Sequence, residues 1–146
     1  DIYAYVGARL ASGQVLFEDV GPDLGTSVVA LAYEKARREG DALVGGIPAL
    51  DFTYGNVWTN IPDALFETLA PKPGERFRLV VSRAGRTVFE GVLPYARTFG
   101  DVPEGEPLLF LNSLLNLSFA LNMGDFAARH GISSGAEWSV RIERAR

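Results

Sequence analysis

Apolar and polar residues alternate along two stretches of the chain, 76–82 and 138–143, and this pattern is typical of strands with one buried face. The apolar members are Phe77, Leu79, Val81, Trp138, Val140 and Ile142. After the first stretch, residues 83–86 form a turn and the chain returns through 87–95, which predicts a hairpin. We therefore expect antiparallel sheet in the second half of the chain.

Three further strands are predicted from apolar runs. Residues 43–50 contain glycines and Pro48, which suggests a bent barrel strand. Residues 56–61 and 108–111 complete the set.

Helical signals are short. Residues 1–11 are predicted to form a helix, with Asp1 as N-cap and Ile2, Val6 and Leu10 on one face. Further helices are expected over 31–38, 62–69 and 125–130. Many short strands with short helices between them predict a mainly β fold, a small, partly open β-barrel.

Composition narrows the function. The chain has 146 residues, no cysteine, a single histidine (His130) and a net charge of 14 − 18 = −4. Clustered basic residues bind nucleic acids, so an acidic chain argues against such a partner. No apolar run approaches the roughly 20 residues of a membrane-spanning helix, and no metal site is expected. Without a signal-like N-terminal run, we expect a cytoplasmic location, and a first residue other than Met suggests a fragment.

Residues 51–61 combine a carboxylate, amides and aromatic side chains around Gly55. One interpretation is a hairpin turn at Tyr54-Gly55-Asn56, because these residue types favour turns. The other is a polar ligand pocket, in which aromatic faces and amides suit a flat heterocycle and Asp51 suits a cation.

Asn112-Ser113 allows two similar readings, a strand end with a cap or a site for a carboxylate. Phe99 suits the core or a stacking surface, and Arg97 and Asp101 are expected to form a surface ion pair. His130 is expected to be solvated or stabilised by its helix dipole.

Taken together, these motifs resemble one family, the S-adenosylmethionine hydroxide adenosyltransferases, relatives of the fluorinase and chlorinase. The resemblance is carried by Asp51, Tyr54-Gly55-Asn56, Thr59-Asn60-Ile61, residues 98–107, Asn112-Ser113 and Ala120-Leu121-Asn122. It implies a two-domain enzyme in which residues 1–14 are a remnant of an N-terminal α/β domain and residues 15–146 are the C-terminal β-barrel domain. The catalytic Asp, Arg and His would lie upstream, so no residue here is catalytic and the fragment alone would be inactive.

The implied reaction is attack of hydroxide on the ribose C5′ of S-adenosylmethionine, giving adenosine and L-methionine without a further cofactor. The implied assembly is a homotrimer with the site at a subunit interface. Asp51 would hold the methionine ammonium, Ser113 its carboxylate, and Asn56 the adenine edge. The remaining implied substrate-binding residues are Tyr54, Trp58, Phe99, Asn122 and Met123, the last two reading adenine through their backbone.

Two positions depart from the halogenating members, which carry Arg where this chain has Leu114 and Leu121. Both departures favour the hydroxide branch. The alternatives are a non-catalytic module, for trimer assembly or for binding adenosine-like ligands, and an OB-like nucleic-acid binder, which the acidic charge disfavours.

Overall fold

The computed structural model describes residues 2–29 and 33–145. By its contacts the chain divides into two units, Asp1–Leu31 and Ala32–Arg146. The first unit contains α1 (Ile2–Ala11) and a short 3-10 helix, η1 (Phe17–Asp19), and none of the residues of α1 is buried. The predicted helix is thus present, while the expected cap Asp1 lies outside the described residues. The assignment of residues 1–14 to an α/β domain stays a prediction.

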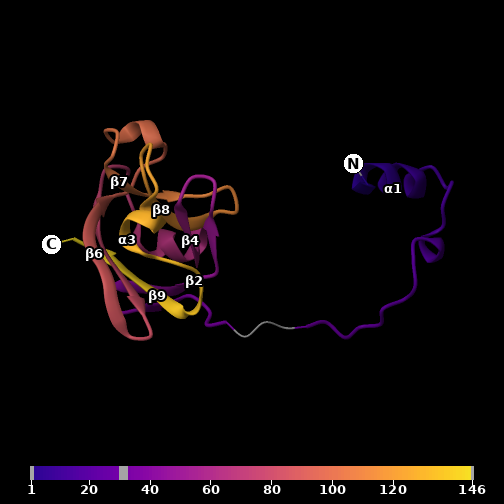
Figure 1. Ribbon diagram of the computed structural model, residues 1–146, viewed down its shortest axis with the longest axis horizontal. Helices are drawn as coiled ribbons and strands as arrows, with labels where there is room; N and C mark the ends of the chain where they lie inside the picture. The colour runs from indigo at the N-terminus through magenta and orange to yellow at the C-terminus, as the bar shows by residue number, and fades with distance from the viewer. Residues whose placement is uncertain (1, 30–32, 146) are drawn as a thin grey trace. The chain divides into compact units, whose positions relative to one another are not determined.

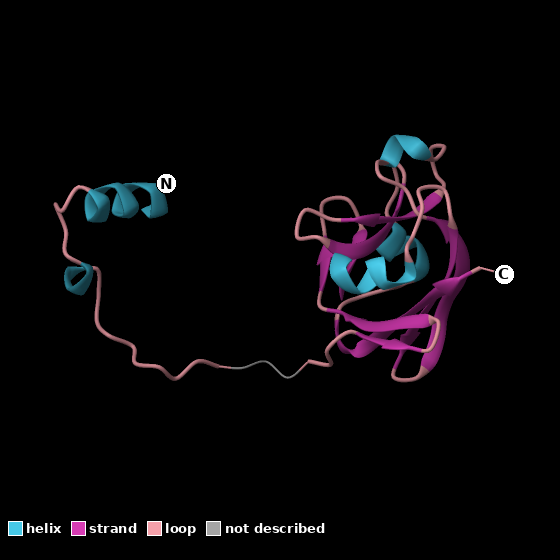
Figure 2. Cartoon of the chain, turned by 180° about the vertical axis from the view of Figure 1, so that it is seen from behind, coloured by secondary structure: helices cyan, strands magenta, loops and turns pink. Residues whose placement is uncertain are grey.

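The second unit is mainly β, as predicted, and consists of two antiparallel sheets (Figures 1 and 2). Sheet A has the order β1-β2-β9-β5-β6, and sheet B the order β3-β4-β8-β7. In sheet A these strands are β1 (Arg37–Glu39), β2 (Ala42–Ile47), β9 (Gly135–Arg144), β5 (Arg76–Arg83) and β6 (Arg86–Pro94). In sheet B they are β3 (Ala49–Asp51), β4 (Asn56–Pro62), β8 (Asn116–Leu121) and β7 (Pro107–Leu111).

The two sheets do not close into a barrel. An isolated β-bridge between Tyr95, just after β6, and Leu109 of β7 links their edges. They are also joined at Pro48, where β2 of sheet A passes into β3 of sheet B. Proline has no backbone N–H to give to a sheet, so the predicted bend falls at this residue.

The core lies between the sheets, and both supply it. Phe77 of β5 and Phe119 of β8 are fully buried, as are Phe66 of α2 (Asp63–Phe66) and Phe126 of α3 (Phe126–His130). The rings of Phe66 and Phe77 lie 5.3 Å apart, and those of Phe119 and Phe126 lie 5.1 Å apart. The helix predicted over 62–69 is present as α2 followed by the 3-10 helix η2 (Glu67–Leu69).

One predicted helix is wrong, and the solvated alternative for His130 does not hold. Of the helix predicted over 31–38, Leu31 and Ala32 lie outside the described residues, residues 33–36 are irregular, and residues 37–39 form β1. Pairing with β2 decides this, because residues 37–39 add to the edge of sheet A through the turn at Gly40. His130 is not freely solvated, since its ring lies 4.6 Å from both Phe89 and Phe126 and burial lowers its pKa, helped by the charge of Arg129.

Among the described residues, no helix is both long enough and apolar enough to cross a membrane.

Candidate functional site

The β3–β4 connection is a tight hairpin turn. Asp51 and Asn56 are paired across it, and the carbonyl of Asp51 accepts hydrogen bonds from the backbone of Tyr54 (3.2 Å) and Gly55 (2.7 Å). Gly55 has φ 67°, the left-handed region that glycine adopts without a Cβ penalty. The turn interpretation of these residues is therefore correct, and it does not exclude the pocket interpretation, because the turn also forms one wall of a pocket.

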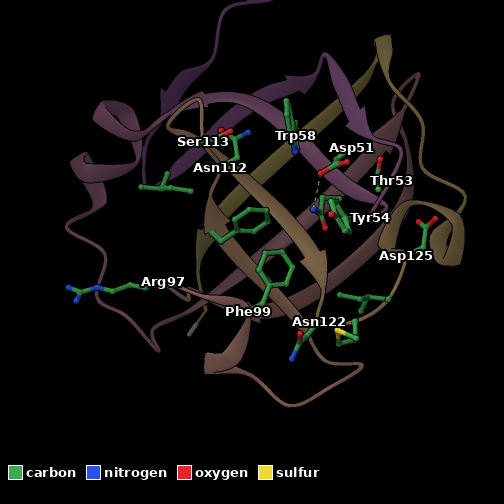
Figure 3. Close-up of a pocket in the computed structure, with 16 residues that line it drawn as sticks. Asp51, Thr53, Tyr54, Trp58, Arg97, Phe99, Asn112, Ser113, Asn122 and Asp125 are labelled. Atoms are coloured by element: carbon green, nitrogen blue, oxygen red, sulfur yellow. Dashed lines mark hydrogen bonds between the residues drawn. The ribbon is translucent and has the colours of Figure 1, made fainter.

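Asp51 and Asn56 are joined through their side chains. Asn56 Nδ2 donates to Asp51 Oδ2 at 3.3 Å, the bond drawn as a dashed line at Asp51 in Figure 3. Asn56 is only 7% exposed, and its Oδ1 is buried without a hydrogen-bond partner in the described chain. A buried acceptor left unpaired costs about 1–3 kcal/mol, so the Asn56 amide is held in this position at a cost in folding free energy.

The turn between β7 and β8 is organised by Asn112. Its Oδ1 accepts hydrogen bonds from the backbone of Leu114 (2.9 Å) and Asn116 (3.1 Å), and its Nδ2 donates to Ser118 Oγ at 3.0 Å. Asn112 is buried, whereas Ser113 is exposed. The strand-end interpretation therefore applies to Asn112, and the hydroxyl of Ser113 is left on the pocket wall.

Phe99 is carried by the 3-10 helix η3 (Phe99–Asp101). Thr98 and Asp101 form a capping box, in which Asp101 Oδ2 accepts from the backbone N–H groups of Thr98 and Arg97, both at 2.9 Å. The expected ion pair of Arg97 and Asp101 is thus replaced by a bond to the backbone of Arg97. Phe99 packs on Phe110 of β7 at 5.0 Å and stays partly exposed toward the pocket.

The carboxylate of Asp101 makes η3 sensitive to acid. Hydrogen bonds from the Thr98 and Arg97 backbone lower its pKa below the ordinary 3.8. A carboxyl whose folded pKa is depressed stabilises the fold above its ordinary pKa, and this contribution is lost as the pH falls through the folded value. We expect the urea midpoint of the wild type to fall more steeply below about pH 4 than that of Asp101→Asn, whose amide oxygen still accepts from the backbone. Parallel pH profiles of the two proteins would contradict this assignment.

The turn after β8 contributes Asn122 and Met123. The backbone of Asn122 is already engaged, because its N–H donates to Glu106 O at 2.9 Å and its carbonyl accepts from Gly105 at 2.7 Å. Its side chain donates to Val102 O. Met123 has φ 56° and is 81% exposed. Of the predicted pair, Met123 therefore has the backbone that is freer to read a ligand edge.

α3 fixes the hairpin turn from outside. Asp125 caps the helix by accepting from Ala128 N at 2.7 Å, and Ala127 N donates to the Gly55 carbonyl at 3.0 Å. The helix covers the predicted range and ends at Gly131, whose left-handed conformation is typical of a glycine at a helix C-terminus.

All these segments surround one pocket of about 840 Å³. Its wall includes every residue assigned to substrate binding by the sequence, namely Asp51, Tyr54, Asn56, Trp58, Phe99, Ser113, Asn122 and Met123. Figure 3 shows Asp51, Thr53 and Tyr54 together at one end, Arg97 at the other, and Phe99 between them. The structure thus brings these residues together, while their binding roles stay predictions.

Sequence reasoning missed other members of the wall, of which Asp125, Thr53 and Arg97 are polar. Asp125 begins a predicted helix, and an aspartate at that position predicts a helix cap rather than a pocket residue. In the described part of the chain, no group of three or more His, Cys, Asp or Glu side chains could hold a metal ion.

Comparison with known proteins gives the family. The family model for the SAM hydroxide adenosyltransferase C-terminal domain matches residues 45–139. A fluorinase from Actinopolyspora mzabensis is 34% identical over 99% of this chain and 47% of its own length. An (R)-S-adenosyl-L-methionine hydrolase from Salinispora tropica is 32% identical over 92% of this chain and 46% of its own length.

A solved structure of an uncharacterized conserved protein from Thermotoga maritima is also similar, with a TM-score of 0.74 and 35% identity. The match covers 99% of this chain and 51% of that one. This chain spans about half the length of the curated relatives it matches. The chain belongs to the SAM hydroxide adenosyltransferase family, and the part that matches is the C-terminal domain of that family.

Proposed function

We propose that this chain forms the substrate-binding part of an enzyme that cleaves S-adenosylmethionine with water or hydroxide to adenosine and L-methionine. The observation that carries the proposal is that the Asp51–Asn56 pair and the aromatic side chains of Tyr54, Trp58 and Phe99 line one pocket. Aromatic faces with a few polar groups suit a purine, and the pocket volume lies within the range of small-ligand sites. The name of the hydrolase relative supports the same substrate.

In the proposed reaction, hydroxide forms a bond to C5′ while the C5′–S bond breaks. The electron pair of that bond goes to sulfur, so the sulfonium leaves as a neutral thioether. Charge is neutralised as the reaction proceeds, so a site that excludes water favours the transition state. Trp58, Phe99, Phe110 and Leu121 give the pocket such an apolar lining.

The residues of this chain bind rather than cleave in this proposal. Asp51 holds the ammonium of methionine, Ser113 its carboxylate, and Asn56 the adenine edge. Phe99 packs on adenine beside Tyr54, and the backbone of Met123 meets the base.

We also propose that the protein is a homotrimer in which a neighbouring subunit covers the pocket. The proposed location of the enzyme is the cytoplasm. Large apolar side chains exposed on the turns around the pocket support a covering partner; they are Phe52, Tyr54, Leu114, Leu115 and Met123. Leu114 and Leu121 stand where the halogenating members carry Arg, and this supports water over halide as nucleophile.

The test is calorimetric binding of S-adenosylmethionine to the complete protein, together with detection of adenosine and methionine. Asp51→Ala and Asn56→Ala should each weaken binding about tenfold or more, because hydrogen bonds to charged or buried groups contribute about 1.5–3 kcal/mol. Asp41→Ala is the control, since Asp41 is an exposed carboxylate in the β1–β2 turn and is not part of the pocket wall. Wild-type affinity in both pocket variants would refute the site, and binding without cleavage would favour a non-catalytic module.

A further inference from the structure

The connection between β6 and β7, residues 95–106, packs on the face of sheet B that is turned away from the core between the sheets. A separate apolar cluster holds it there, with Phe99 packed against the buried residues Ala96, Val102, Leu108, Phe110 and Ala120. The same connection supplies Arg97 and Phe99 to the pocket wall. The position of this connection therefore decides whether Phe99 faces the pocket.

The middle of the connection makes few hydrogen bonds to the rest of the fold. Residues 97–101 bond among themselves, through the capping box of η3 and the turn that it closes. Across the described residues, the one hydrogen bond that ties residues 97–102 to another segment runs from Asn122 Nδ2 to Val102 O, at 2.9 Å. Apolar contacts are non-directional, whereas a hydrogen bond fixes the position of the atoms that make it.

Asn122 is itself well fixed, directly after β8. Its backbone N–H donates to Glu106 O at 2.9 Å, and its carbonyl accepts from Gly105 N at 2.7 Å. These two bonds hold the end of the connection, and the side-chain bond to Val102 holds its middle. Asn122 thus lines the pocket, yet the hydrogen bonds of its backbone and its side-chain nitrogen run to the connection.

We infer that Asn122 is a positioning residue: through Val102 it holds the β6–β7 connection so that Phe99 faces the pocket. The inference rests on the proposed function, in which Phe99 packs on adenine, and it gives Asn122 a role other than reading the base. Binding groups are precise only when supporting contacts lock them in place. Without the Asn122 bond, η3 is free to shift on its apolar contacts, and a bound base must then order it.

The test is a double-mutant cycle on adenosine affinity, measured by calorimetry with the complete protein. Phe99→Ala should weaken adenosine binding about tenfold, because it removes the ring on which the base stacks. Asn122→Ala should weaken binding about fivefold, in line with the loss of one hydrogen bond. In the Phe99→Ala background, Asn122→Ala should have almost no further effect, because no ring remains to be positioned.

Asn122→Asp separates the hydrogen bond from the shape of the side chain. An ionised aspartate has nearly the same shape but no donor, so it makes no bond to the Val102 carbonyl. This variant should behave as Asn122→Ala does, and it replaces that variant if alanine prevents folding, as judged by circular dichroism. Asn116→Ala is the matched control and should bind adenosine as the wild type does, because Asn116 begins the same strand, β8, and is not part of the pocket wall.

Backbone hydrogen exchange gives a second readout, which a uniform loss of stability does not produce. In Asn122→Ala, the amides of residues 99–102 should gain more in exchange rate than the amides of β5 do, because the connection loosens locally. An equal gain in both segments would show that the Asn122 bond does not hold the connection in particular.

The outcomes separate the inference from the function beneath it. Wild-type adenosine affinity in Asn122→Ala would overturn the inference, and so would an effect of Asn122→Ala that keeps its size without Phe99. Unchanged adenosine affinity in Phe99→Ala, or a wild type that binds S-adenosylmethionine but not adenosine, would overturn it too. These results leave the proposed reaction standing, whereas a wild type that binds neither S-adenosylmethionine nor adenosine would overturn the proposed function itself.

Discussion

Gly55→Ala is expected to destabilise the chain by about 3 kcal/mol or more and to abolish ligand binding in the pocket. A Cβ on Gly55 would lie 2.0 Å from Oδ1 and 2.1 Å from Cγ of Asp125, well inside van der Waals contact. The backbone of Asp125 is also close, with its Cα at 2.6 Å, so rotation of the side chain does not remove the overlap. The left-handed φ of 67° adds the strain of a Cβ in that region, about 1–2 kcal/mol.

Binding should be lost together with stability because Gly55 lies between Asp51 and Asn56. If the turn moves away from Asp125, the bond from Ala127 N to the Gly55 carbonyl breaks and the two binding side chains move with the turn. Chemical unfolding and adenosine titration measure the two effects.

Gly105→Ala is the control for Gly55→Ala. Gly105 also has a left-handed φ, of 80°, but a Cβ there would meet no atom within 4 Å. This variant should show the conformational strain alone, about 1–2 kcal/mol. Equal destabilisation of the two variants would show that contact with Asp125 does not hold the turn.

The strands with one buried face were predictable from sequence because their alternation is a local property. On β5, Phe77, Leu79 and Val81 all point into the core between the sheets, as the period of two requires. β8 was missed because it is buried on both faces at its centre, where Leu117 through Ala120 are all buried and no alternation remains. β1 was predicted to be part of a helix. Residues 37–39 form a strand because they pair with β2, and a local sequence pattern does not reveal such pairing.

The pocket was predictable only in part. Resemblance to a family identified residues on separate turns. Strand pairing places the turns at 52–55 and 122–124 at one end of sheet B and the turn at 112–115 at the other, and all three contribute to the wall of one pocket. The sequence did not reveal that the Asn122 backbone is used by residues 105 and 106, nor that Asp125 abuts Gly55. Both facts depend on contacts between segments distant in sequence, and only the folded chain defines them.

Phe126→Ala is expected to cost about 3–5 kcal/mol of unfolding free energy, the range for deleting a buried phenylalanine ring. Phe126 is fully buried, and its ring lies 5.0 Å from Phe89 of sheet A and 5.1 Å from Phe119 of sheet B. It is thus a direct link between the two sheets. It is also the first residue of α3, directly after the pocket residue Asp125, so the cavity left by the ring should loosen the helix that supports the hairpin turn.

Urea unfolding of Phe126→Ala, compared with Phe52→Ala, tests this role. Phe52 is 85% exposed, so the same deletion there removes few contacts and should leave the unfolding midpoint nearly unchanged. Adenosine affinity should fall in Phe126→Ala even at temperatures where the variant remains folded, because the cap at Asp125 no longer rests on a fixed helix. A folded Phe126→Ala variant with wild-type adenosine affinity would show that the hairpin turn keeps its shape without support from α3, and the binding geometry would then be a property of sheet B alone.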